Sequence, residues 1–257
     1  MKFKVKKKYG QHFLQNNKVI REITSLKNLN GKNIIEIGPG FGSLTVEILK
    51  MSPKILICIE KDQTLKPYLE KIKKNNKVRF KVIYDDALDI NLNELKIKNK
   101  IILLANLPYN IATTLIMKWL RYINIFESII VMIQSEVAQR LTAKVSSKFY
   151  GRVSVLVQLH SFVKEKILVK PENFYPKPKV TSSVIEIIPK KKINFNYNEI
   201  DFLLKHSFQH RRKKIKNNLK NIYPNIHFKL TQNGLNENAR PQDISPENYI
   251  NLCRSLQ

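Results

Sequence analysis

Short apolar runs recur along the first two thirds of the chain, separated by longer segments in which apolar residues repeat every three or four positions. Continuous apolar runs such as Ile101 to Ala105 are typical of strands buried on both faces of a parallel sheet. The alternation of such strands with helices predicts an α/β fold. The pattern predicts strands at 34–37, 55–59, 78–84, 101–105 and 129–133, and helices at 44–50, 65–74, 112–122 and 136–144.

The pattern changes after Gly151. Two strand-like runs, 153–163 and 180–188, are joined by a proline-containing linker and predict an antiparallel pair at one edge of the sheet. This gives a mostly parallel, seven-stranded sheet with helices on both faces. After Pro189 the periodicity is helical to the end, with a helix start expected at Ser245-Pro246. We therefore expect an α/β domain of residues 1–191 and a small all-helical domain of residues 192–257.

The net positive charge of the chain indicates which class of molecule it binds. The 257 residues include 46 Lys and Arg against 20 Asp and Glu, a formal net charge of +26, so a polyanion such as RNA is the expected ligand. The basic N-terminal arm, residues 1–8, is expected to touch phosphates. Cys58 and Cys253 have no metal-ligand spacing, and no apolar stretch reaches the ~18 residues of a membrane span. These features predict a cytoplasmic protein without a metal or a membrane.

Three of the seven glycines fall within five residues, between a predicted strand and a predicted helix: Gly38, Gly40 and Gly42. Glycine there lets the backbone approach a ligand closely. The dinucleotide-binding fingerprint needs its third glycine one residue later. The loop instead resembles the first motif of class I methyltransferases, which implies S-adenosylmethionine as cofactor.

Two acidic residues follow the next two predicted strands. Glu60, 20 residues after Gly40, is placed to accept both hydroxyls of a ribose. Asp86 follows the third strand, where the methyltransferase pattern has the acid that binds the adenine amine of the cofactor. Each acid alone is typical of an exposed strand end, but the two together, after the glycine loop, predict a nucleoside site.

The sequence Asn106-Leu107-Pro108-Tyr109 follows the fourth strand and fits methylation of an adenine amine. The lone pair of that amine is delocalised into the ring, so it is a poor nucleophile. The Asn106 amide oxygen and the carbonyl of Leu107 or Pro108 can accept its two hydrogens and aim the lone pair at the methyl group. Tyr109 offers a ring on which an extruded base stacks. Rate enhancement by positioning, without a general base, is therefore expected.

With these motifs in place, the chain resembles the family of small-subunit rRNA adenine dimethyltransferases over nearly its whole length. Residues 8–14 are similar to the N-terminal signature, which implies that Gln11, His12 and Leu14 join the cofactor site. Residues 174–180 are similar to a late motif, which implies that Phe174 takes the other face of the target base. Residues 134–140, a basic helix at 208–219 and Arg240-Pro241 also match. The basic residues expected to contact RNA are Arg140, Lys179, Arg211, Arg212, Lys213 and Lys216.

The resemblance implies methylation of two adjacent adenosines near the 3′ end of 16S rRNA. The enzyme is expected to be a monomer that acts on this RNA within an immature 30S subunit. Other functions remain open from the sequence. A 23S rRNA methyltransferase of the macrolide-resistance type shares the glycine loop and the acids. A DNA adenine methyltransferase and a non-catalytic assembly factor on the same fold are further alternatives.

Overall fold

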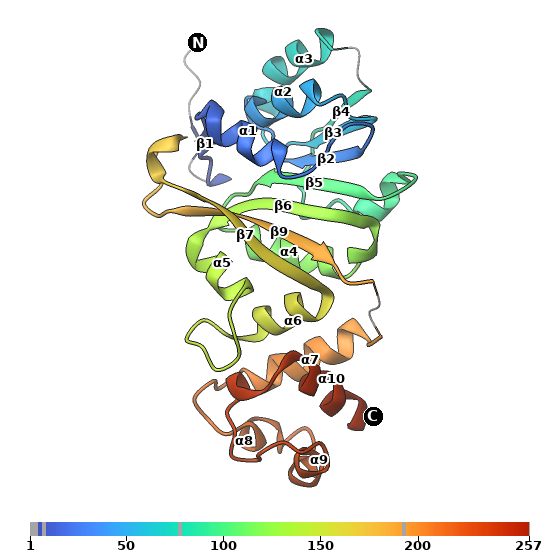
Figure 1. Cartoon of the computed structure of the whole chain (residues 1–257), viewed down its shortest axis with the longest axis vertical. Helices are drawn as coiled ribbons and strands as arrows, with labels where there is room; N and C mark the ends of the chain where they lie inside the picture. Colours follow the sequence, from blue (N-terminus) through green and yellow to red (C-terminus); the bar gives the residue numbers. More distant parts are fainter. Residues whose placement is uncertain (1–4, 7–8, 77–78, 192–193, 257) are drawn as a thin grey trace. The chain divides into compact units, whose positions relative to one another are not determined.

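A seven-stranded sheet forms the centre of the fold (Figure 1). The computed structural model describes residues 5–6, 9–76, 79–191 and 194–256. The strand order is β4-β3-β2-β5-β6-β9-β7. The strands are β2 (Asn33–Ile37), β3 (Ile55–Ile59), β4 (Phe80–Ile83), β5 (Ile101–Asn106), β6 (Phe126–Gln134), β7 (Ser161–Val169) and β9 (Ser182–Pro189). β2 to β6 pair in parallel and β9 pairs antiparallel to β6, which confirms the mostly parallel sheet.

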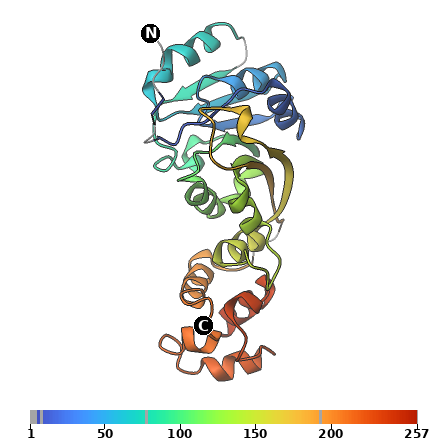
Figure 2. The ribbon, with the colours of Figure 1, turned by 90° about the vertical axis from the view of Figure 1, so that its left-hand side faces the viewer.

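Helices cover both faces of this sheet (Figure 2). The helices are α1 (Asn17–Ser25), α2 (Ser43–Lys50), α3 (Lys66–Lys74), α4 (Ala112–Leu120) and α5 (Ser135–Leu141). From β2 the chain continues to β3 and β4 on one side of the sheet, and from β5 it continues to β6 on the other side. Because crossovers between parallel strands are right-handed, α2 and α3 lie on one face and α4 on the other. The strand order therefore reverses between β2 and β5, and their carboxyl ends are where an open α/β sheet binds a ligand.

The sheet is buried on both faces. All five residues of β2 are buried, and Ile34, Leu56 and Ile102 on neighbouring strands have no exposed surface. Each such side chain contributes roughly 2 kcal/mol of transfer free energy. A rigid sheet of this kind holds the loops at its edge in fixed positions.

The strand predicted at 153–163 is wrong over most of its length. Residues 152–160 form helix α6 (Arg152–His160), and β7 begins only at Ser161. Val155, Leu156 and Val157 are successive residues of α6 and all have no exposed surface. A short helix buried on every side carries no amphipathic period, and its β-branched valines mimic a strand.

The chain divides into two compact units, one of residues 1–138 and 164–189, the other of residues 139–163 and 190–257. The second unit thus includes residues 139–163, which the expected boundary at 191/192 places in the first domain. Beyond residue 190 its elements are all helical: α7 (Tyr197–Ser207), α8 (Ile215–Leu219), α9 (Ile226–Gln232) and α10 (Pro246–Ser255). The predicted helix start is confirmed, since the Ser245 hydroxyl accepts a hydrogen bond from the Asn248 amide at 3.1 Å.

A second, two-stranded sheet joins distant parts of the first unit. Strand β1 (Phe13–Leu14) pairs antiparallel with β8 (Phe174–Tyr175), with Phe13 opposite Tyr175 and Leu14 opposite Phe174. Among the described residues, no helix has the length and apolar character needed to cross a membrane. The N-terminal arm expected at residues 1–8 falls mostly outside the described residues.

Candidate cofactor and catalytic site

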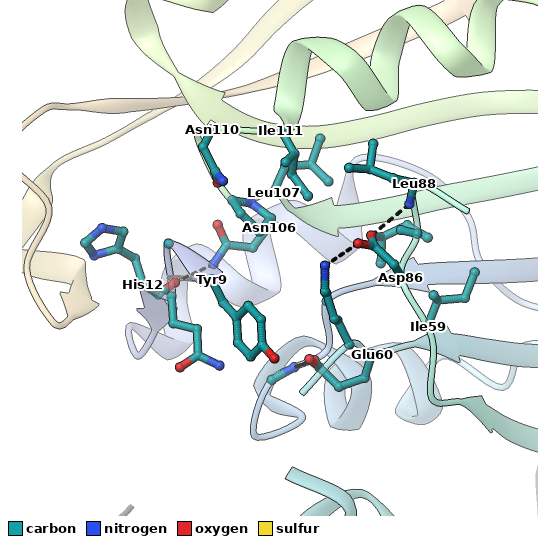
Figure 3. A pocket seen from close by; sticks show the side chains of 18 of the residues that line it. Tyr9, His12, Ile59, Glu60, Asp86, Leu88, Asn106, Leu107, Asn110 and Ile111 are labelled. Carbon is teal, nitrogen blue, oxygen red and sulfur yellow. Dashed lines mark hydrogen bonds and ion pairs between the residues drawn. The ribbon is translucent and has the colours of Figure 1, made fainter. Parts of the chain in front are cut away.

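An open cleft lies at the carboxyl ends of β2 to β5, and it brings together most of the residues that the sequence predicted (Figure 3). Apolar side chains such as Ile59 and Leu88 line it beside the polar ones. Its lining includes Gln11, His12, Gly38, Gly40, Glu60, Asp86, Asn106, Leu107, Pro108 and Tyr109. The glycine loop is therefore not packed shut against its neighbours.

Glycine is required at two positions of the loop for different reasons. Gly40 has a φ of +60°, and a Cβ there would lie 2.9 Å from Cδ1 of Phe13. Gly42 has a φ of +87°, and a Cβ there would lie 2.2 Å from Cδ1 of Ile72 on α3. Any side chain would both strain the backbone and collide with a neighbour. The conformation of the loop therefore depends on glycine at both positions.

Glu60, directly after β3, is tied to this loop. Its Oε2 accepts a hydrogen bond from the Gly40 amide at 3.1 Å, and its Oε1 accepts one from the Asp62 amide at 2.8 Å. Burial raises the pKa of the Glu60 carboxyl, and the two amide bonds only partly oppose this. Each oxygen keeps a further lone pair, so the carboxylate can still accept bonds from two hydroxyls.

Asp86 follows β4 and is held by two groups. Its Oδ1 accepts a hydrogen bond from the Leu88 amide at 2.9 Å, and its Oδ2 pairs with the ammonium of Lys61. Burial raises the pKa of the Asp86 carboxyl, but the hydrogen bonds from Lys61 and Leu88 outweigh burial and lower it. Asp86 is therefore an ionised acceptor at neutral pH, directed into the cleft.

Asn106 ends β5, and one contact fixes which way its amide points. Its Nδ2 donates a hydrogen bond to the backbone oxygen of His12 at 2.8 Å. A carbonyl oxygen only accepts, so the NH₂ group of Asn106 must face His12. The Oδ1 atom is consequently the end of the amide that remains for a substrate. Figure 3 shows this hydrogen bond, with Tyr9 between Asn106 and Glu60.

The backbone carbonyls of Leu107 and Pro108 differ in whether the fold already uses them. The Pro108 oxygen accepts hydrogen bonds from the amides of Ile111 at 3.2 Å and Ala112 at 3.1 Å, where α4 begins. The Leu107 amide donates to the Met132 oxygen on β6 at 3.1 Å, which fixes the turn against the sheet. Because α4 occupies the Pro108 carbonyl, the Leu107 carbonyl is the better second acceptor for an amine.

Tyr109 is restrained at its ring and at its hydroxyl. The ring stacks on His12 with centroids 5.4 Å apart and an interplanar angle of 24°. The hydroxyl shares a hydrogen bond with the Ser182 hydroxyl at 2.7 Å. His12 Nδ1 lies 2.7 Å from the Pro176 oxygen, so that nitrogen carries the proton and donates.

This arrangement agrees with the comparisons with known proteins. The sequence model of a family described as "Ribosomal RNA adenine dimethylase" matches residues 2–257. The chain belongs to the ribosomal RNA adenine dimethylase family. It is an rRNA adenine dimethyltransferase, as the sequence motifs predicted.

Two relatives of this dimethyltransferase carry the name ribosomal RNA small subunit methyltransferase A. The one from Ehrlichia canis is 41% identical over 254 residues, which cover 98% of this chain and 97% of the relative. The one from Wolbachia pipientis of Culex pipiens is 38% identical over 256 residues, covering 98% of this chain and 97% of the relative.

Solved structures confirm the class I methyltransferase fold of the enzyme. A dimethyladenosine transferase from Plasmodium falciparum superposes with a TM-score of 0.80 at 26% identity, covering 94% of this chain and 96% of that one. The 23S rRNA methyltransferase ErmE has a TM-score of 0.71 at 22% identity, covering 95% and 99%, and shows the fold alone.

The structure does not place two predicted site residues of the dimethyltransferase on the cleft. Leu14 and Phe174 face each other across the β1–β8 pair and are 6% and 5% exposed, within the hydrophobic core. Burial against each other and the core is the physical reason. Leu14 does line a smaller neighbouring cavity with Gly38 and Asn106. The cofactor role of Leu14 and the base-stacking role of Phe174 therefore stay predictions. The residue after Phe174, Tyr175, is 60% exposed instead.

The predicted basic helix at 208–219 is confirmed only over its last five residues. Residues 208–214 form turns between α7 and the short α8, which begins at Ile215. Arg211 is held by Gln242 Oε1 at 2.9 Å, and Lys216 pairs with Glu237 at 3.1 Å. In a continuous helix, Arg212 and Lys216 would lie four residues apart on one face and repel each other, which favours the open turn.

The other predicted RNA contacts differ in their surroundings. Arg212 and Lys213 are exposed and have no ion pair among the described residues. Lys179 is exposed in the loop before β9, and Arg140 lies in the last turn of α5. Arg212, Lys213 and Lys179 are thus better placed for phosphate contacts than Arg211 or Lys216.

Several residues of the cleft carry no assignment from the sequence motifs. Tyr9 lines the cleft, and Lys61 Nζ lies 5.8 Å from the centroid of its ring. Lys61 could have been noticed as the residue after Glu60, but its partner Asp86 is 25 positions away. The others are Ile59, Leu88, Asn110 and Ile111.

Proposed function

We propose that this enzyme uses S-adenosylmethionine to methylate the N6 amine of two adjacent adenosines near the 3′ end of 16S rRNA, giving N6,N6-dimethyladenosine during small-subunit biogenesis. The observation that carries the proposal is the orientation of Asn106, whose Oδ1 is left for a substrate because Nδ2 is bound to His12. The substrate is proposed to be an immature 30S subunit, met in the cytoplasm by a monomeric enzyme.

The residues of the cleft fit the proposed cofactor. S-adenosylmethionine supplies an electrophilic methyl group on a positively charged sulfur. Glu60 would accept the two ribose hydroxyls, and Asp86 would accept the adenine amine, because both are held at the cleft as acceptors. The apolar side chains of Ile59 and Leu88 would pack against the adenine ring. Gln11 donates to Asp62 at 2.8 Å and fixes the N-terminal segment over this part of the cleft.

The chain's own residues would then prepare the target amine. Asn106 Oδ1 and the Leu107 carbonyl would each accept one N–H hydrogen, which favours a pyramidal nitrogen with its lone pair directed at the methyl group. Tyr109 would stack on the extruded base. In the transfer, the new N–C bond would replace the C–S bond of the methyl donor, and the extra proton on nitrogen would pass to solvent. Positioning of this kind supplies the rate enhancement.

Phosphate contacts would hold the RNA. Lys179, Arg212 and Lys213 are exposed cations, and the net charge of +26 favours association with RNA at low salt. Arg140, Arg211 and Lys216 remain candidates for phosphate contacts. Arg211 and Lys216 are the weaker ones, because their side chains already bind within the protein.

The test is replacement of Asn106 by Ala. Loss of a positioned hydrogen-bond acceptor at the reacting atom lowers kcat by about 100-fold or more. Asn93→Ala, an exposed asparagine, is the matched control and should keep full activity. The assay measures labelled methyl transfer to immature 30S particles, naked 16S rRNA and 23S rRNA. If Asn106→Ala keeps full transfer, the mechanism is refuted, and transfer to 23S rRNA alone would refute the substrate.

A further inference from the structure

Two adjacent serines of β9 make nearly the same hydrogen bond, but only one of these bonds reaches the catalytic motif. Ser182 and Ser183 both have no exposed surface. The Ser182 hydroxyl lies 2.7 Å from the Tyr109 hydroxyl, and the Ser183 hydroxyl lies 2.8 Å from that of Ser135. We propose that Ser182 is a positioning residue, which acts through Tyr109 and is needed most for the second methyl transfer to each adenosine.

The backbone fixes the Ser182 hydroxyl in place. Ser182 lies opposite Gln134 at the end of the β6–β9 pairing, and the Ser135 amide donates to the Thr181 oxygen at 3.0 Å. A buried side chain on a paired strand has little freedom to follow a moving partner. The hydrogen bond therefore holds the Tyr109 hydroxyl at one point relative to the sheet.

A second contact restrains the same ring from another element. His12 stacks on Tyr109, and its Nδ1 is bound to the Pro176 oxygen at 2.7 Å. The ring is thus restrained at its face by the N-terminal segment and at its hydroxyl by β9. Without Ser182, the tyrosine keeps its ring and the His12 contact but can rotate about its side-chain torsions.

The two methyl transfers depend on this ring to different degrees. This step rests on the proposed function. Unmodified adenosine presents two N–H groups, one each for Asn106 Oδ1 and the Leu107 carbonyl. After the first transfer only one N–H remains, so one of the two orienting hydrogen bonds is lost. Stacking on Tyr109 then supplies a larger share of the alignment, and a loosened ring slows the second transfer more than the first.

The experiment compares Ser182→Ala with Ser183→Ala, which deletes a hydroxyl with the same burial and nearly the same bond length on the same strand. Single-turnover reactions with enzyme in excess are followed by mass spectrometry of N6-methyl- and N6,N6-dimethyladenosine. Loss of one neutral hydrogen bond corresponds to up to about tenfold in rate. We expect Ser182→Ala to slow the second transfer by about that factor and the first by much less, so that monomethyladenosine accumulates. Ser183→Ala should give the wild-type ratio.

Tyr109→Phe provides an independent probe if Ser182→Ala does not fold. It removes the same hydrogen bond from the other side while keeping the ring, so it should give the same product ratio. The double variant should be no worse than either single one, because both delete one interaction. Ser182→Thr, which retains a hydroxyl, should restore dimethylation.

The inference is overturned if Ser182→Ala leaves the ratio unchanged, or if Ser183→Ala shifts it equally. It is also overturned if the effects of Ser182→Ala and Tyr109→Phe add in the double variant. These results would leave the proposed function standing, since that function is tested separately by the large fall in kcat of Asn106→Ala and by the choice of rRNA.

Discussion

A carboxylate buried under the glycine loop should make the stability of the enzyme depend on pH. Glu36, in β2, is 1% exposed. Its Oε2 accepts hydrogen bonds from Thr45 Oγ1 at 2.7 Å and from Cys58 Sγ at 3.3 Å. Burial raises the pKa of Glu36 to about 7, although the bonds from Thr45 and Cys58 oppose the shift and the nearby charge of Glu60 adds to it. The perturbation to make is Glu36→Gln, which keeps the shape and cannot ionise.

The magnitude follows from the pKa in the folded and unfolded states. A rise from the ordinary 4.5 to about 7 means that folding disfavours ionised Glu36 by about 3 kcal/mol. The folded protein holds this proton more tightly, so the stabilising contribution is fully present below about pH 4.5 and is lost as pH rises through about 7. Any fixed cost of the glutamine amide is the same at every pH. The stability of Glu36→Gln relative to wild type should therefore rise by about 2 to 3 kcal/mol between about pH 5 and pH 8.5.

Trp119 makes the measurement direct. It is the only tryptophan of the chain, has no exposed surface and lies in α4, in the same compact unit as Glu36. Its fluorescence in urea titrations reports unfolding of that unit. The control is Glu94→Gln, an exposed acid of the same compact unit whose charge contributes little to stability. A constant difference between wild type and Glu36→Gln across this pH range would refute the reasoning.

Three further outcomes are expected. Gly40→Ala should weaken cofactor binding in calorimetry by about tenfold or more, because the residue needs a φ of +60° and its Cβ would contact Phe13. Cofactor affinity of the wild type should fall as pH drops through the raised pKa of Glu60, since the carboxylate is the required acceptor, and Glu60→Gln should bind weakly with no such dependence. Arg212→Ala and Lys213→Ala should each lower the salt slope of RNA binding by about one, with cofactor affinity unchanged.

Matched variants separate these effects from general damage. Gly31 has a φ of +67° but open space around its Cβ position, so Gly31→Ala should leave cofactor affinity intact. Lys71→Ala and Lys74→Ala remove exposed cations of α3 and should leave the salt slope unchanged. Equal losses in control and test variants would contradict the assigned roles. Cofactor affinity in Glu60→Gln that still falls at low pH would place the titrating group elsewhere.

The sheet and its binding edge were predictable because each element there has a simple pattern. Residues 55–59 and 101–105 are continuous apolar runs, and polar residues follow each of them directly. Glu60 and Asn106 could thus be placed at one edge of a parallel sheet without coordinates. Helix α6 could not be predicted in the same way, because burial on all sides removes the helical period and leaves only the strand preference of its valines.

Contacts between distant residues were the second limit. The motif containing Phe174 suggested a stacking ring, but its pairing with Leu14 in the core depends on the β1–β8 register. The ion pair of Lys61 with Asp86 depends on the spacing of β3 and β4. A sequence shows which residue types are present but not which side chains meet across strands. The orientation of Asn106 by His12 belongs to the same class.

The β1–β8 pair also determines when the catalytic site can form during synthesis on the ribosome. His12, which orients Asn106, is bound in turn to Pro176, 164 positions later. A nascent chain can build the first parallel strands and the glycine loop long before that residue leaves the exit tunnel. The side-chain amide of Asn106 gains its full set of restraints only afterwards. A partly translated chain should therefore not methylate the ribosomal RNA that surrounds it.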